Sequence, residues 1–149
     1  MATPFIEAFF TILSQVGLQN VQRGKLGVKE NLHTSMNVST VIGVSNMLRG
    51  NVTYSMEEET AKRLASILMM GMPVQELDAM AQSAIAELSN MLVSNTVAIF
   101  EKQKIFVNVS PPTLVVGQNV TLRISQVQTL MVEILTEAGM IELNIGLEM

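Results

Sequence analysis

The chain contains no cysteine, no tryptophan and a single histidine among its 149 residues. Without cysteine it has no disulfide framework and no thiolate for a nucleophile or a metal site. Zinc sites need more histidine or cysteine ligands than this chain offers. A catalytic triad would have to recruit His33, yet no nucleophile-elbow sequence accompanies it. We therefore expect His33 to be a surface or turn residue.

Charge is also scarce, because charged residues make up only 15% of the chain and the formal net charge is −4. The nine basic residues are scattered and aromatic residues are few, so nucleic-acid binding is not indicated. No glycine-rich loop of the nucleotide-binding type occurs. Any phosphoryl chemistry of this chain must therefore use a phosphate and a metal that a partner brings.

Long apolar runs are absent as well. No stretch approaches the roughly 18 apolar residues that a membrane span needs. The opening MATPFIEAFFTILSQVG lacks a basic leader and a small-residue cleavage site, and it contains Glu7. Thr3 as N-cap, Pro4 in the first turn and Gly17 at the end predict a helix of the mature protein instead. We expect a cytoplasmic protein that does not bind membranes.

The remaining pattern predicts helices and strands in separate runs. A bent strand or an irregular strand pair is expected over 21–32 and a hairpin over 36–56. Ser55 and Glu58 have the spacing of a capping box, which starts a helix near Met56 that ends at Gly71. A longer helix follows over about 74–102. Five strands come last, over 104–110, 113–117, 119–127, 129–137 and 140–148.

This order favours an α+β fold, an antiparallel sheet with helices packed on one face. Each half of the chain reads as a helix followed by strands, which suggests an approximate internal twofold repeat. No linker divides the chain, so residues 1–149 are expected to form a single domain.

Methionine is abundant, with twelve residues, and it packs well into irregular cores. Methionine-rich surfaces can also bind peptides. We expect Met69, Met70 and Met72, at the end of the first of the two central helices, to lie in the core.

The long helix carries the clearest functional signal. Its apolar residues recur at steps of three and four, which predicts an amphipathic helix. This buried stripe is expected to contain Leu77, Met80, Ala81, Ala84, Ile85, Leu88, Met91, Leu92 and Ile99. The opposite face carries Ser83, Glu87, Asn90 and Ser94, and Glu87 is the only charge between Asp78 and Glu101. A face so poor in charge is typical of a surface on which another protein sits.

Glu87 and Asn90 are three residues apart, so their side chains project from the same face. The carboxamide of Asn90 is a poor general base, but it can accept a hydrogen bond from a water and donate another. Orienting a water toward phosphorus is a positioning task of this kind. Glu87 could hold a cationic side chain of a partner. Glu-x-x-Asn alone is a weak signal, and a polar stripe on a solvated helix remains the alternative.

The arrangement Ser83-x-x-x-Glu87-x-x-Asn90, followed by Pro111-Pro112, resembles the active-site signature of the CheC/CheX/FliY family of chemotaxis phosphatases. The stretches TPFIEAFFTILSQVG, RGNVTYSM, ILMMGMPVQELDAM and VNVSPPTLVVG are also similar to CheX members, so the resemblance covers nearly the whole chain. The family's two-site members carry the signature on two helices. Here Phe10 stands three residues after Glu7, so we expect one active site.

The resemblance implies an α+β fold, a homodimer, and dephosphorylation of the phospho-aspartate of the response regulator CheY or a related receiver domain. Glu87 would pair with a lysine of the regulator and Asn90 would orient the attacking water. Ser83, Ser94 and Pro112 would contact the partner; Pro111 is the alternative to Pro112. The chain would need no cofactor of its own, because Mg²⁺ belongs to the regulator.

Two other interpretations remain open. The same fold could bind a receiver domain, or oligomerise, without hydrolysis. Alternatively, the charge-poor helix face could be buried in an obligate oligomer. We favour dimerisation through sheet edges, which would leave that face open.

Overall fold

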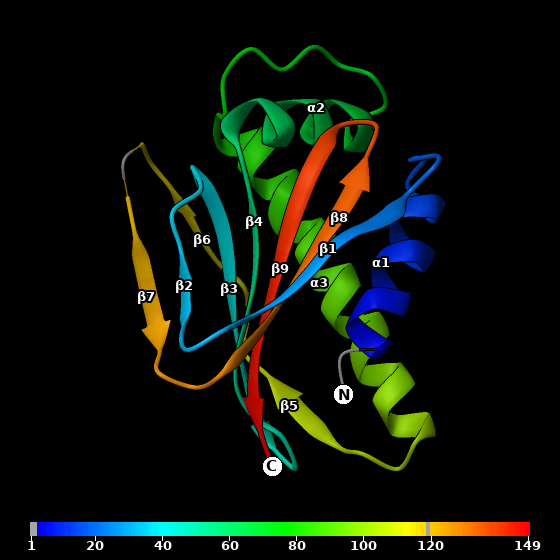
Figure 1. The fold of residues 1–149 in the computed structure, drawn as a ribbon. Helices are drawn as coiled ribbons and strands as arrows, with labels where there is room; N and C mark the ends of the chain where they lie inside the picture. The colour runs from blue at the N-terminus through cyan, green and yellow to red at the C-terminus, as the bar shows by residue number, and fades with distance from the viewer. Residues whose placement is uncertain (1–2, 119) are drawn as a thin grey trace.

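The computed structural model describes residues 3–118 and 120–149 (Figure 1). The three helices are α1 (Thr3–Gln15), α2 (Glu58–Leu68) and α3 (Ala79–Lys102). The strands are β1 (Gln22–Lys29), β2 (Leu32–Thr34), β3 (Val38–Asn46), β4 (Arg49–Met56), β5 (Val107–Val109), β6 (Thr113–Val116), β7 (Leu122–Ser125), β8 (Thr129–Thr136) and β9 (Gly139–Glu148).

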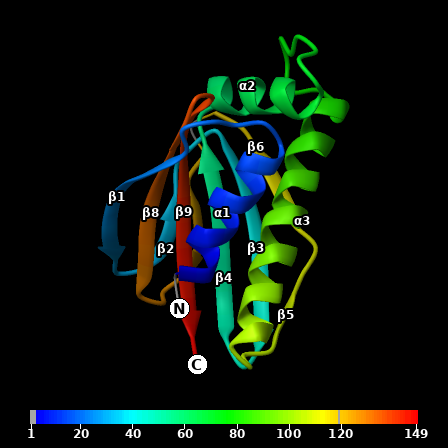
Figure 2. The same cartoon turned by 90° about the vertical axis from the view of Figure 1, so that its right-hand side faces the viewer.

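Seven strands form one sheet in the order β1-β8-β9-β4-β3-β5, and β6 also pairs with β3. All of these pairs are antiparallel. Helices α1 and α3 lie side by side over one face, and α2 lies across the end of the sheet (Figures 1 and 2). Strands β2 and β7 form a separate antiparallel ribbon. The predicted α+β fold is confirmed.

The strand order confirms the approximate twofold repeat. Exchanging β1 with β6, β3 with β8 and β4 with β9 leaves the pairing pattern unchanged except for β5, which pairs with β3 and has no counterpart beside β8. Under the same exchange, β2 takes the place of β7, its own partner in the ribbon, and α1 takes the place of α3. The two helices therefore occupy equivalent places on the sheet.

The core lies between the sheet and the two long helices. Alternate residues of the central strands, such as Val52 of β4 and Leu143 of β9, are fully buried on this side. The rings of Phe9 and Tyr54 meet edge to face at 5.2 Å between centroids. Burial raises the pKa of the Tyr54 hydroxyl well above its usual range, so this residue stays neutral. These buried contacts hold the two helices on the sheet.

The opposite face of the sheet carries a polar network beneath β2. Lys29 Nζ lies 2.9 Å from Glu142 Oε1 and donates to the His33 carbonyl oxygen at 3.2 Å. Asn144 Nδ2 donates to Glu142 Oε1 and to Thr53 Oγ1. Through Lys29, this network links β2 of the ribbon to β9 of the main sheet. It therefore holds in place the bend predicted over 21–32.

Most predicted strands are present with shifted ends. The hairpin over 36–56 is β3 and β4, and the bent segment is β1 and β2, with a register shift in β1 between Arg23 and Leu26. The strand predicted over 104–110 is shorter and forms β5. The strand predicted over 119–127 is β7, and Asn119 lies outside the described residues. No helix in the described ranges is long and apolar enough to span a membrane.

One predicted helix cap and one predicted helix start are wrong. Ser55 does not cap α2, because it is buried in β4 with its Oγ 2.9 Å from Ser39 Oγ. The Asn37 side chain accepts the Glu58 N–H instead, so a residue distant in sequence supplies the cap. The long helix begins at Ala79 rather than near 74, because the Asp78 side chain accepts the Ala81 N–H at 2.9 Å.

The expectation for the methionines after α2 is also wrong. Met70 is 96% exposed and Met72 is 54% exposed, while Met69 is half-buried. Just after α2, Met70 adopts φ 61° and the Gly71 N–H donates to the Ser66 carbonyl. This helix end turns the chain outward, so the methionines lie on the surface rather than in the core.

Candidate docking and catalytic face

Helix α3 presents one buried and one exposed side. Its buried residues are Ala81, Ile85, Leu88, Ser89, Leu92, Val93, Thr96 and Phe100. The Ser89 and Thr96 hydroxyls donate to the carbonyls of Ile85 and Leu92, which satisfies them within the core. Met80, predicted in the buried stripe, is instead 61% exposed.

The four polar residues predicted for the opposite side form one exposed row. Ser83, Glu87, Asn90 and Ser94 are all exposed, and they follow one another at steps of three and four along α3. Within the described residues, the side chains of Glu87 and Asn90 form no hydrogen bond and no ion pair. Both side chains are therefore free to meet a partner.

The chemistry of this face follows from the two central residues. On a helix, side chains three apart have Cβ atoms about 5–6 Å from each other. A carboxylate and a carboxamide at this spacing can grip a cation and orient a water on the same partner. The row lies on a convex helix surface, so the reacting group would have to come from another molecule that covers it.

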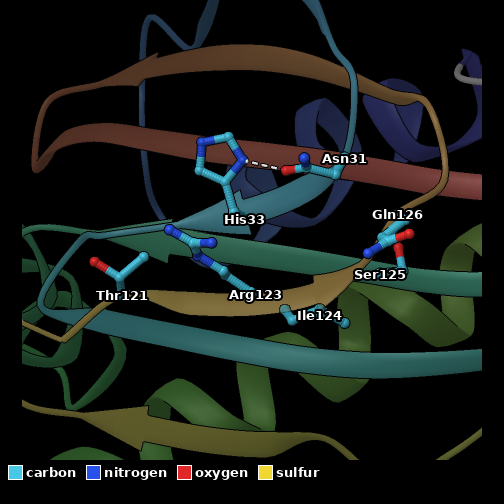
Figure 3. Close-up of a pocket in the computed structure, with 7 residues that line it drawn as sticks. All are labelled: Asn31, His33, Thr121, Arg123, Ile124, Ser125 and Gln126. Carbon is cyan, nitrogen blue, oxygen red and sulfur yellow. Dashed lines mark hydrogen bonds between the residues drawn. The ribbon is translucent and has the colours of Figure 1, made fainter.

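A separate polar hollow surrounds the single histidine. It has a volume of about 490 Å³ and is lined by Asn31, His33, Thr121, Arg123, Ile124, Ser125 and Gln126 (Figure 3). His33 is exposed on β2, opposite Arg123 of β7, and its Nδ1 lies 2.8 Å from Asn31 Oδ1. This agrees with the expected surface role of His33. Across the described ranges, no three His, Cys, Asp or Glu side chains are grouped to hold a metal.

Comparison with known proteins decides the family. The model of the family "Chemotaxis phosphatase CheX" matches residues 38–135. The chain belongs to the CheX family. This match includes α3 and the whole of the exposed polar row.

Individual CheX relatives agree with the match. The "CheY-P phosphatase CheX" of Thermotoga maritima is 32% identical over 113 residues, which are 76% of this chain and 72% of that protein. The chemotaxis protein CheX of Desulfovibrio desulfuricans has the same fold, with a TM-score of 0.87, 22% identity and coverage of 99% and 98%. The CheX–CheY–BeF₃–Mg²⁺ complex of Borrelia burgdorferi matches with a TM-score of 0.84, 23% identity and coverage of 99% and 97%.

In this CheX-family chain, α1 holds the position equivalent to α3 but lacks the carboxamide. Glu7 is exposed on α1, as Glu87 is on α3, and Phe10 is exposed where Asn90 stands. The phenyl ring of Phe10 cannot orient a water by hydrogen bonding. At the position that corresponds to Asn90, the exposed face of α1 therefore has no carboxamide to orient a water.

The prolines of the CheX-like signature lie in the connection between β5 and β6. This connection runs beside α3, and both strands contact the helix (Figure 2). Ser110 fixes it to β3, because its Oγ accepts the Gly43 N–H at 2.8 Å and its own N–H donates to the Gly43 carbonyl. Pro111 is exposed and Pro112 is half-buried. Contact of Pro112 with a partner stays a prediction.

Proposed function

We propose that this chain is a phosphatase that hydrolyses the phospho-aspartate of a CheY-like receiver domain. The observation that carries the proposal is the exposed Glu87–Asn90 pair on α3 of a CheX-family fold. The name of the Thermotoga relative and the CheX–CheY complex of Borrelia support a CheY-like partner. The proposed unit is the single domain 1–149, and the proposed place of action is the cytoplasm.

In the proposed reaction, α3 docks over the phosphorylated aspartate of the partner. Glu87 pairs with a lysine of the receiver domain and fixes the position of the helix. The Asn90 carboxamide holds a water in line with phosphorus. The water oxygen bonds to phosphorus and the bond from phosphorus to the aspartate oxygen breaks, which releases phosphate and a free carboxylate. The partner supplies Mg²⁺, consistent with the Mg²⁺ in the Borrelia complex.

Phosphate release from phosphorylated CheY, measured with and without this chain, tests the proposal. We expect a faster release in proportion to the chain concentration. Binding to phosphorylated CheY without acceleration would contradict the proposal and favour a non-catalytic binding module.

Replacing Glu87 with alanine is expected to raise KM about tenfold while kcat changes little, because the ion pair acts in docking. Steady-state phosphate release at increasing concentrations of phosphorylated CheY measures both constants. Glu101→Ala is the matched control, since Glu101 is another exposed acid of α3. A fall in kcat with KM unchanged would instead place Glu87 in the chemical step.

We also propose a homodimer formed through the edge strand β1. In the described part of the chain, β1 pairs only with β8, so its other edge is open. Leu26 is 52% exposed and Val28 is 66% exposed on this strand. An open strand edge with exposed apolar side chains is a template for pairing with a second chain.

Val28→Lys is expected to convert the dimer to a monomer, because lysine on an edge strand disfavours pairing between edges. Light scattering coupled to size-exclusion chromatography measures the mass. Lys25→Arg, on the same strand, keeps the charge and serves as the control. A Val28→Lys variant that stays dimeric would exclude this edge as the interface.

A further inference from the structure

Three methionines are exposed at the end of the molecule where α3 begins. Met70 and Met72 lie in the loop between α2 and α3, and Met80 lies in the first turn of α3. Figure 2 shows this loop beside the start of α3. Exposed apolar residues that are scattered singly need no explanation, but a group of them marks an interaction site. Methionine suits such a site because its flexible thioether adapts to the partner.

Met80 belongs to the same row as the proposed catalytic pair. Met80 lies seven positions before Glu87, and a step of seven residues falls only about 20° short of two full helical turns. Met80, Ser83, Glu87, Asn90 and Ser94 thus form one continuous exposed row on α3. A partner that covers Glu87 and Ser83 reaches Met80 next.

The size of a protein interface requires such an extension. The polar row from Ser83 to Ser94 spans only about 16 Å of helix, whereas a specific interface buries about 800 Å² on each partner. Toward its end, α3 carries the exposed charged residues Glu101 and Lys102. Toward its start lie Met80 and Met72, beside the exposed acids Glu76 and Asp78. Interface cores are enriched in methionine, so the exposed methionines favour an extension toward the start.

We infer that Met80 is an apolar docking contact for the phosphorylated receiver domain and helps to select it. This inference rests on the proposed function, because the receiver is the molecule that covers Glu87 and Asn90. The occupant is the phosphorylated receiver domain, which on this inference meets Met80 with apolar side chains. Met80 thus sets the affinity for the receiver, while Asn90 sets the rate of hydrolysis.

Met80→Gln and Met80→Leu test the inference with phosphorylated CheY of Borrelia burgdorferi as the probe. Glutamine keeps the length and the helix propensity of methionine but loses its apolar character. We expect Met80→Gln to raise KM roughly tenfold with kcat nearly unchanged, because it removes most of one buried apolar contact. Met80→Leu should keep KM within about twofold, since leucine preserves the apolar contact.

Met149→Gln is the control, because Met149 is also exposed but lies at the opposite end of the molecule (Figure 1). An unchanged KM in Met80→Gln overturns the inference, as does a loss of kcat alone. An equal rise of KM in Met80→Leu also overturns it, because the contact would then not depend on apolar character.

Binding to CheY activated with BeF₃⁻ and Mg²⁺ separates this inference from the proposed function. The BeF₃⁻ adduct has no phosphoryl group to hydrolyse, so the dissociation constant reports docking alone. If the unsubstituted chain binds CheY activated with BeF₃⁻ but does not speed phosphate release from phosphorylated CheY, the proposed function fails. Weaker binding by Met80→Gln in that case still supports Met80 as the docking contact, and equal binding overturns it.

Discussion

Asn90→Ala is expected to lower the stimulated rate of phosphate release by about 100-fold or more, the usual scale for loss of a positioning group. Alanine can neither accept a hydrogen bond from the attacking water nor donate one. The effect should appear in kcat, because the docking residues Glu87 and Met80 remain. Single-turnover release from phosphorylated CheY at saturating chain concentration measures it.

The fold should tolerate this change. Asn90 is exposed, and no side-chain hydrogen bond within the described residues depends on it. The thermal midpoint of unfolding should therefore stay close to that of the unsubstituted chain, because exposed changes of this kind usually alter stability by less than about 0.5 kcal/mol. Asn108→Ala, which removes an exposed carboxamide from β5, is the matched control and should keep full activity. A fully active Asn90→Ala variant would remove Asn90 from the mechanism.

The polar row could be predicted from the sequence because helical periodicity is a local property. Steps of three and four place Ser83, Glu87, Asn90 and Ser94 on one side, and their common exposure on α3 agrees. The same arithmetic also places Met80 on that side. Its apolar character assigned it to the core instead, although the seven-residue step to Glu87 was a sufficient signal.

Features that depend on contacts distant in sequence could not be predicted. The cap of α2 comes from Asn37 on the other side of the β3–β4 hairpin, so Ser55 and Glu58 had the right spacing but the wrong partners. Ser89 and Thr96 are polar residues that the helix backbone satisfies inside the core. The twofold strand order depends on pairing between the two halves, which the sequence only suggested.

Glycine gives the clearest case of this limit, because the nine glycines look alike in the sequence. Gly50 adopts φ +143°, and a Cβ atom built on it would lie 1.9 Å from the carbonyl oxygen of Gly146. The two residues lie on the paired central strands β4 and β9. A side chain at position 50 must therefore push the central strands apart or distort both backbones.

Gly50→Ala is expected to reduce the free energy of unfolding by about 3 kcal/mol or more, as other changes that force a backbone clash do. For a chain of this size the thermal midpoint would fall by roughly 10 °C. Gly17→Ala is the matched control, because Gly17 also has a positive φ, +105°, but nothing lies within 4 Å of its added Cβ. The free energy of unfolding of that variant should fall by only about 1–2 kcal/mol, because alanine disfavours a positive φ. Circular dichroism melts of both variants compare the two effects. Equal midpoints would mean that the sheet accommodates the extra methyl group and that the close approach of β4 to β9 is not required.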